Sequence, residues 1–549
     1  MRAQALSIYE RIQNLFKNWR SNPTMLQRFF YRIPPLFWVS LFLIGTVFYF
    51  WRLQQPQPLI EVPADVLPLQ CVSYAPYYKP GMNPTVRDTF VDPVQIDQDL
   101  QAISKVTKCV RTYSVSQGLD YVPKAAQKYG MKVILGAWVG WVDADNMKEL
   151  ELAVNQANQY PDTVRGLVVG NEVLLRGEQS EAKMHEYLQW VKERTKVPLT
   201  YADVWEFWLK YPTLEQEVDF ITVHILPYWE DKPVAIEQAV AHTASVMGHL
   251  GTVFKKPLLI GETGWPSQGR QRFRATPSVV NQVLYVRGFL QAAKQTGWQY
   301  NIIEAMDQPW KRELEGTVGG FWGIFNDELQ PKFNLQGPVS ERSDGWAPYI
   351  VALVMAAAAA GWGVYKGLTA SQKYLLGVVA AGAGLHAYLQ IDYVQLAARN
   401  TAELFGLGGF VLLGWVLVGL QLRQWLGFTP KSCLEQSLLR LFAIALFVTS
   451  AGLAIDGRYL NFPLILSWLP LISIVISLIT AQQQETASTH HRQTGFWLTV
   501  VMVMMAANMA VAVAMMEPGN ITAWWWSAVC GLALFVLPAK SMQLAAKTA

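Results

Sequence analysis

Two glutamates follow similar apolar runs, at the points where buried parallel strands would end. Glu172 comes after the run Leu167–Gly170 and the amide Asn171, and Glu262 follows Leu258–Ile260 about ninety residues later. Apolar runs bounded by glycine are typical of strands in a parallel sheet, whose carboxyl ends meet at one edge. Two neighbouring carboxylates cannot ionise equally, so we expect one to have a raised pKa and donate a proton while the other stays charged. Such a pair is what chemistry at a glycosidic bond needs.

The elements that must position these glutamates alternate between strands and helices. Eight strands separated by amphipathic helices over some 270 residues predict an α/β fold, a (β/α)8 TIM barrel, which carries its active site at the strand C-termini. A doubly wound open sheet is the alternative, but the first strand is not followed by the Gly-rich phosphate loop that such a sheet needs. The predicted strands are 70–74, 109–113, 132–138, 166–170, 198–202, 220–224, 257–261 and 301–305.

Further candidate site residues stand at or just after these strand ends. They are carboxylates, amides and aromatics, with no Ser-His-Asp order. Aromatic side chains offer apolar faces to sugar rings, and polar groups bind the hydroxyls. His224, taken alone, is more often a structural hydrogen-bonding residue than a catalyst. The candidate substrate-binding residues are Asn171, Tyr74, Tyr113, Trp138, His224, Tyr228, Trp265, Glu304, Asp307, Trp310 and Lys311.

The composition points to a membrane part. The chain is 52% hydrophobic and only 16% charged, below the roughly 25% charged of soluble proteins. The net charge of +4, with no basic patch among aromatics, argues against a nucleic-acid partner. No pattern implies a cofactor, and none of the four cysteines lies in a metal-binding motif. Cys71 and Cys109 could pair outside the cytoplasm, but we favour two buried free thiols.

Uncharged apolar stretches flank the predicted barrel on both sides. A basic N-terminal segment precedes the first stretch, Pro34–Trp51, and predicts a retained signal anchor with the N-terminus in the cytoplasm. Lys and Arg fall in alternate short loops, which supports eight spans with both termini cytoplasmic and the barrel outside. The loop with Arg270, Arg272 and Arg274 is predicted to be solvated, with lipid headgroups as the alternative contact. The seven later spans are 348–365, 374–391, 402–422, 438–455, 463–480, 496–515 and 523–537.

These observations divide the chain into six predicted parts. The boundaries follow the change from basic to apolar, then Pro-rich, then alternating, and then apolar sequence. The parts are a cytoplasmic basic segment (1–33), a signal-anchor helix (34–53), a linker (54–68), the extracytoplasmic barrel (69–340), a seven-helix transmembrane region (346–538) and a cytoplasmic tail (539–549).

Four segments together resemble glycoside hydrolase family 17, the β-1,3-glucanases and β-1,3-glucan glucanosyltransferases. They are VVGNEVLLRG, VHILPYWE, IGETGWPS and IIEAMDQPWK, with support from VRTYS and GGFWGIF, and they cover about half of the chain. The resemblance implies that Glu172 is the acid/base and Glu262 the nucleophile of a retaining enzyme. It also implies that Tyr113, Tyr228, Glu304, Asp307 and Lys311 line the glucan groove. Spans on both sides of the barrel depart from the secreted plant members and resemble bacterial proteins of periplasmic or exported glucan assembly.

The sequence therefore predicts a membrane-anchored enzyme that acts on a β-1,3-glucan substrate. Transglycosylation, which elongates the glucan or adds β-1,6 branches, is placed slightly ahead of hydrolysis, because a tether keeps nascent glucan at high effective concentration. The alternative from a different class is a glucan-binding scaffold or export partner. The expected location is the bacterial inner membrane, with the barrel in the periplasm. The other expected partners are membrane lipids and a membrane glycosyltransferase to which the protein docks.

Overall fold

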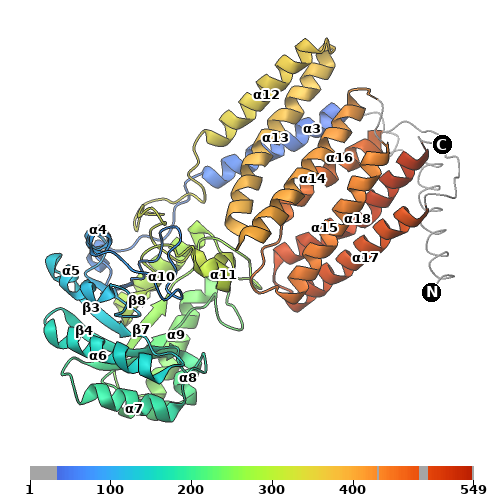
Figure 1. Cartoon of the computed structure of the whole chain (residues 1–549). Coiled ribbons are helices and arrows are strands. Elements are labelled where there is room, and N and C mark those ends of the chain that lie inside the picture. The colour runs from blue at the N-terminus through green and yellow to red at the C-terminus, as the bar shows by residue number, and fades with distance from the viewer. Residues whose placement is uncertain (1–33, 429–431, 481–492, 547–549) are drawn as a thin grey trace.

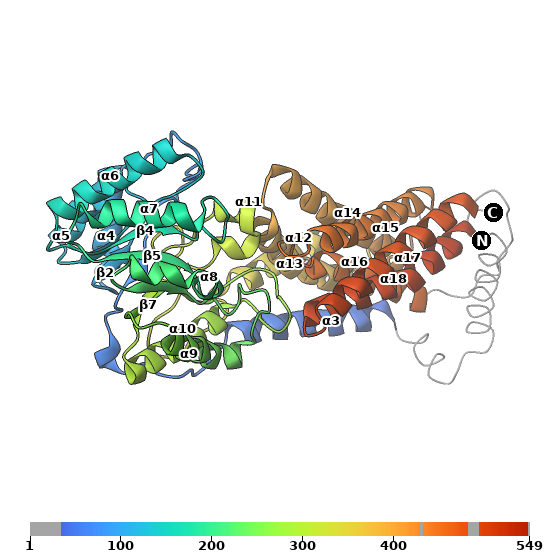
Figure 2. The ribbon, with the colours of Figure 1, turned by 90° about the horizontal axis from the view of Figure 1, so that it is seen from below.

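The chain forms a barrel and a helical bundle that lie end to end (Figure 1). The computed structural model describes residues 34–428, 432–480 and 493–546. Helix α3 (Pro35–Gln54) packs with the bundle, after which the chain builds the barrel and returns to the bundle for its C-terminal part. Figure 2 shows α11 (Lys311–Glu315) on the side of the barrel that faces the bundle.

Eight parallel strands close the barrel in chain order. This confirms the predicted (β/α)8 fold, and each of the eight predicted strands overlaps an observed one. The strands are buried along most of their length, which is why apolar runs located them. They are β1 (Val72–Ser73), β2 (Cys109–Arg111), β3 (Lys132–Ala137), β4 (Val164–Asn171), β5 (Leu199–Val204), β6 (Ile221–His224), β7 (Leu258–Thr263) and β8 (Gln299–Ile302).

Amphipathic helices cover the outside of the barrel. Three of them begin at a side chain that accepts a hydrogen bond from the first turn, namely Asp92, Ser180 and Ser278, as expected for N-caps. The helices are α4 (Pro93–Ile103), α5 (Val122–Lys128), α6 (Asp143–Gln159), α7 (Glu181–Lys192), α8 (Trp205–Lys210), α9 (Ile236–Val253) and α10 (Val279–Thr296). Short 3₁₀ turns are η1 (Ala64–Val66), η2 (Leu119–Tyr121), η3 (Pro212–Gln216) and η4 (Thr317–Gly320).

A disulfide joins β1 and β2, which corrects our preference for two free thiols. Cys71 and Cys109 are bonded, with their Cα atoms 4.4 Å apart. The next pair in the ladder is Val72 opposite Val110, so the two cysteines face each other across adjacent strands. A sequence without strand register cannot show this proximity. The bond lies beside the seam, where the two-residue strand β1 also pairs with β8.

The bundle consists of α3 and seven C-terminal helices. Within the residues that the structure describes, seven of these eight helices are long and apolar enough to cross a membrane, and α16 is a shorter apolar helix of 17 residues. Each covers a predicted span, and several extend past it; α18 continues through residues that we placed in the tail. The helices are α12 (Ala347–Tyr365), α13 (Ala370–Ala397), α14 (Thr401–Trp425), α15 (Ser432–Ile455), α16 (Leu464–Thr480), α17 (Gln493–Met516) and α18 (Ile521–Ala546). Some of the basic residues that we predict on the cytoplasmic side lie outside the described residues. They are those of segment 1–33, Lys431, His490–Arg492 and Lys547.

The loops that follow β6, β7 and β8 contact the bundle. Arg270 forms an ion pair with Glu517 at 2.9 Å, and the Asn461 amide donates to the Thr317 hydroxyl. Arg270 and Arg272 are 3% and 5% exposed, so the prediction of a solvated loop is wrong for both. The α17–α18 connection supplies the carboxylate that pairs with Arg270. The bundle therefore covers part of the face of the barrel on which the strands end.

Candidate active site

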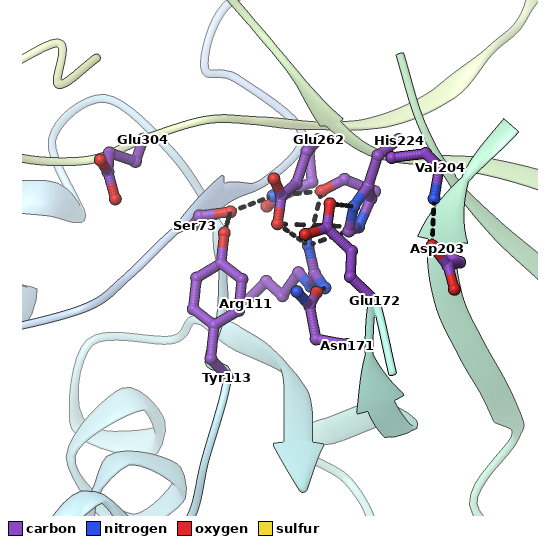
Figure 3. Close-up of polar contacts among 12 residues, drawn as sticks. Ser73, Arg111, Tyr113, Asn171, Glu172, Asp203, Val204, His224, Glu262 and Glu304 are labelled. Atoms are coloured by element: carbon purple, nitrogen blue, oxygen red, sulfur yellow. Dashed lines mark hydrogen bonds and ion pairs between the residues drawn. The ribbon is translucent and has the colours of Figure 1, made fainter. Parts of the chain in front are cut away.

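Three strands bring Glu172, His224 and Glu262 together (Figure 3). One oxygen of each glutamate and a ring nitrogen of His224 all lie within 4.8 Å of one another. The strand ladders are irregular beside each of these residues, between Val168 and Asn171 and around Gly261. Such irregularities re-aim side chains at the ends of strands. The pair that the sequence predicted at two strand ends is therefore brought together by the fold.

The backbone holds Glu172 in an unusual conformation. Its φ is +53°, in the left-handed region that few non-glycine residues adopt, and it follows Gly170 at +80°. The Glu172 amide donates to the Ala202 carbonyl of β5 at 2.7 Å, which fixes this turn. Residues held in such conformations cluster at functional sites.

Arg111, on β2, connects the parts of the site. Its guanidinium donates to Glu262 Oε1 and to the Gly261 carbonyl, both at 3.0 Å, and to Asn171 Oδ1. The side chain is buried and lies over the Tyr113 ring, 4.7 Å from its centroid. A positive charge against Glu262 suits a carboxylate that must stay negative to attack. Arg111 is not among the predicted site residues, although a charged residue within a buried strand is a signal of function.

His224 connects Glu172 to Arg111. His224 Nε2 lies 3.3 Å from Arg111 Nη1, the nitrogen that also donates to Glu262 Oε1 and to the Gly261 carbonyl. His224 Nδ1 donates to Glu172 Oε1 at 2.8 Å. His224 is 1% exposed and both of its ring nitrogens contact groups of the site, so it lies between the two glutamates; its predicted role in substrate binding stays a prediction.

Glu172 does not have the raised pKa that we expected for a proton donor. Burial raises its pKa, but the hydrogen bond and the charge of His224, together with the charges of Arg176 and Arg111, outweigh burial, so the pKa is lowered. The neighbouring carboxylate alone, on which we based the expectation, is not the largest influence on Glu172.

Replacing His224 by alanine should change the pH dependence of the reaction. Without the hydrogen bond from His224, the pKa of Glu172 rises, so the proton donor stays protonated to higher pH. We expect the alkaline limb of the kcat/KM profile to move to higher pH. His242→Ala is the control, because His242 pairs with Glu230 at 2.8 Å, outside this site, and should leave the profile unchanged. A uniform loss of rate with an unmoved limb contradicts this role.

Several other predicted residues surround the site. Tyr113 donates to Ser73 Oγ at 3.0 Å, next to Glu262. Trp138 is 40% exposed, with the Arg176 guanidinium 4.3 Å from its ring centroid, and forms an open aromatic face at the end of β3. Lys311 binds Glu304 at 3.0 Å; burial raises the pKa of Glu304 to about 7. Ser73, which we did not predict, also accepts from Asn301 at 2.6 Å.

Other predicted residues do not reach the site. The Tyr74 hydroxyl donates to Asp99 of α4 at 2.8 Å, on the outside of the barrel wall. Tyr228 and Trp265 are fully buried and pack on each other, with hydroxyl and indole bound to loop carbonyls. The structure does not bring these three side chains to the glutamates, and their predicted substrate-binding roles stay predictions. Asp307 pairs with Lys332 at 2.7 Å, and Trp310 donates to Gln308 at 2.9 Å.

The same three side chains could in principle hold a cation. Glu172, His224 and Glu262 each offer one ligand atom. However, Arg111 lies 3.0 Å from the Glu262 oxygen and would repel a metal ion there. His224 Nε2 is also engaged by Arg111. The arrangement therefore favours acid–base and nucleophilic chemistry by the two carboxylates.

Comparison with known proteins identifies the type of barrel. Residues 71–323 match the BtgE/BtgC glycoside hydrolase domain. A glucan 1,3-beta-glucosidase of Arthroderma benhamiae is 26% identical over 276 residues, 46% of this chain and 88% of the relative. One of Schizosaccharomyces pombe is 27% identical over 256 residues, 43% and 79% of the two chains. A solved structure, the glycoside hydrolase family 17 beta-1,3-glucanosyltransferase from Rhizomucor miehei, is 26% identical, covering 50% of this chain and 99% of its own, with a TM-score of 0.43.

Proposed function

With a BtgE/BtgC glycoside hydrolase domain in residues 71–323, we propose that the protein is a membrane-anchored, retaining enzyme that acts on β-1,3-glucan. One observation carries the mechanism: oxygens of Glu172 and Glu262 lie within 4.8 Å of each other. The carboxyl groups of retaining pairs are about 5–5.5 Å apart, whereas those of inverting pairs are about 6.5–9.5 Å apart to admit a water. The close approach of one oxygen from each glutamate supports a retaining pair. The relatives named above supply the β-1,3-glucan assignment.

The reaction begins with attack by Glu262 on the anomeric carbon. As the bond between Glu262 and the sugar forms, the glycosidic bond breaks, and Glu172 gives its proton to the departing oxygen. Arg111 donates to Glu262 and positions it, and His224 orients Glu172. The result is a glucosyl group bound to Glu262 and a deprotonated Glu172.

The second step decides between hydrolysis and transfer. Glu172 takes a proton from an incoming hydroxyl, the oxygen of that hydroxyl bonds to the anomeric carbon, and Glu262 is released. If the hydroxyl belongs to water, the glucan is shortened; if it belongs to another sugar, a new linkage forms. We propose transfer, because the barrel is held at the bundle and a tethered enzyme meets glucan chains at high effective concentration.

The products of a defined oligosaccharide test this proposal. We expect the detergent-solubilised full-length protein to convert laminari-oligosaccharides into both longer and shorter sugars, with the linkage of the longer ones determined by NMR. Products that are only shorter make the enzyme a hydrolase. No conversion by protein that retains its fold overturns activity on β-1,3-glucan. Glu262→Gln protein is the control for contaminating glucanases.

The proposed location is a membrane with the barrel on the extracytoplasmic side and both termini in the cytoplasm. The Cys71–Cys109 disulfide supports this side, because disulfides persist mainly in oxidising compartments. The connections of the bundle near Arg399, Arg458 and Glu517 belong to its end that meets the barrel, which is the extracytoplasmic end in the proposed orientation. Arg312 donates to the Gln395 carbonyl, and Arg458 to the Trp229 carbonyl.

The native cysteines allow a test of this orientation. Cys433, at the start of α15, is exposed, and Cys530 is buried. We expect a membrane-impermeant maleimide to label Cys433 only after the membrane is permeabilised, because this end of α15 lies on the cytoplasmic side. Lys105→Cys, at an exposed position on the barrel, is the control and should be labelled in intact cells. Labelling of Cys433 in intact cells would reverse the orientation.

A further inference from the structure

Glu172 stands at the start of a tight turn, in a backbone conformation that needs support. Its φ of +53° lies in the left-handed region. The Arg176 amide donates to the Glu172 carbonyl at 2.9 Å and closes the turn. As in the first turn of a helix, the amides at the start of such a turn have no partner within it. Two of these amides, those of Leu174 and Leu175, therefore depend on groups outside the turn.

Two side chains of β5 bind these amides. The Tyr201 hydroxyl accepts from the Leu174 amide at 3.0 Å, and Asp203 Oδ2 accepts from the Leu175 amide at 3.4 Å. The two side chains also bind each other, because the Tyr201 hydroxyl donates to Asp203 Oδ2. The Val204 amide donates to Asp203 Oδ1 at 2.8 Å (Figure 3). Both side chains are buried, so the turn rests on a fixed part of the barrel wall.

Tyr201 and Asp203 belong to the outer face of β5. Residues two apart on a strand point to the same side. The Tyr201 ring packs on Trp208 of α8, with 5.7 Å between the ring centroids. Ala202, which lies between them in the sequence, clusters instead with apolar residues of β2, β3, β4 and β7, which meet inside the barrel. The two side chains therefore support the turn from outside the strand wall.

β5 thus holds the turn at three points. The third is the Ala202 carbonyl, which accepts from the Glu172 amide at 2.7 Å. A strained backbone conformation persists only where the surrounding structure fixes it. A catalytic group loses much of its effect when it moves by a fraction of its distance to the reacting atoms. Loss of either side chain would therefore displace the Glu172 carboxyl without removing a group that meets the substrate.

We propose that Tyr201 and Asp203 are positioning residues for Glu172, which hold its turn so that the carboxyl meets the glycosidic oxygen. This inference rests on the proposed function, in which Glu172 is the acid/base. Both side chains lie behind the turn and act through Glu172. Neither is among the residues that the sequence predicted for the site.

The test is whether the two residues matter only through Glu172. With detergent-solubilised full-length protein and laminari-oligosaccharides, Tyr201→Phe and Asp203→Asn should each lower kcat/KM by about tenfold, because a buried amide of the turn loses its partner. In a Glu172→Ala background neither should cause a further loss, since the group that they position is gone. On an aryl β-glucoside with an acidic phenol, which departs without a proton, both variants should keep the wild-type kcat/KM.

Two substitutions of the same kind elsewhere in the barrel are matched controls. Tyr300→Phe removes a buried hydroxyl on β8 that accepts from the Gln70 amide at 3.3 Å. Asp219→Asn changes a carboxylate that accepts from the Leu199 amide at 2.7 Å, at the other end of β5. Both should keep the wild-type ratio of kcat/KM on the two substrates.

The outcomes separate this inference from the proposed function. If wild type acts on no laminari-oligosaccharide, the proposed function fails. If wild type is active and the two substitutions cost as much in the Glu172→Ala background as in wild type, the residues support only the fold, and the inference fails alone. An unchanged kcat/KM on laminari-oligosaccharides in both variants also contradicts it. Thermal unfolding checks that each variant is folded, and either substitution alone completes the comparison.

Discussion

Replacing Glu262 by glutamine is expected to lower kcat/KM on laminari-oligosaccharides by about 10⁴-fold or more. Loss of a catalytic nucleophile has effects on this order. The amide cannot attack the anomeric carbon, and the ion pair with Arg111 at 3.0 Å is lost. Initial rates against wild type measure the effect. Glu230→Gln is a matched control, because Glu230 pairs with His242 outside the site. Retention of more than about a tenth of the activity would exclude Glu262 as nucleophile.

The stereochemistry of rescue gives a sharper test of Glu262. In Glu262→Ala, azide can occupy the space of the missing carboxylate and attack the anomeric carbon from the same side. Because the β-linked sugar is displaced once, the product should be an α-glucosyl azide. A β-glucosyl azide would mean that another group still forms the covalent intermediate.

Replacing Glu172 by alanine is expected to cost about 10²–10⁴-fold on a glucan, the usual contribution of a general acid. The loss should be much smaller on an aryl β-glucoside with an acidic phenol, because that leaving group departs without a proton. Azide should accelerate this variant and give a β-glucosyl azide, since it displaces the sugar from Glu262 in a second inversion. Equal losses on both substrates would contradict the role of Glu172 as proton donor.

The sequence was sufficient for the barrel and for its two glutamates. Buried parallel strands are short apolar runs, and such runs mark their own ends. Glu172 and Glu262 directly follow two of these runs, and the fold of parallel strands then brings them together without further information. The eight apolar helices were equally visible, because a span must be apolar over most of its length.

The side chains that surround the glutamates were harder to predict from the sequence, because their positions depend on side-chain direction and strand register. Ser73 faces Tyr113 and Asn301 inside the barrel, so its neighbour Tyr74 must point outward to α4. Tyr228 and Trp265 follow their strands but are folded into loops. The lowered pKa of Glu172 depends on His224 and two arginines, which only the structure brings near it.

Contacts between the barrel and the bundle could not be predicted from local patterns. Arg270 is an exposed loop residue by composition, and it is buried only because Glu517, 247 positions later, packs against it. The disulfide between Cys71 and Cys109 could not be predicted from local patterns either, because it depends on the register of two strands.

The short strand β1 makes the integrity of the barrel depend on where the protein is made. Val72 lies opposite Ile302 across the closing seam, where the Ile302 and Ala305 amides donate to the Cys71 and Ser73 carbonyls, and the neighbouring disulfide holds β1 to β2. In a reducing cytosol this covalent link is absent, so we expect the local stability of β1 to be lower there. Production in an oxidising compartment is therefore expected to give the more stable barrel. In a chain that stays in the cytosol, more frequent opening at β1 would expose strand edges, where proteolysis and strand-to-strand association begin.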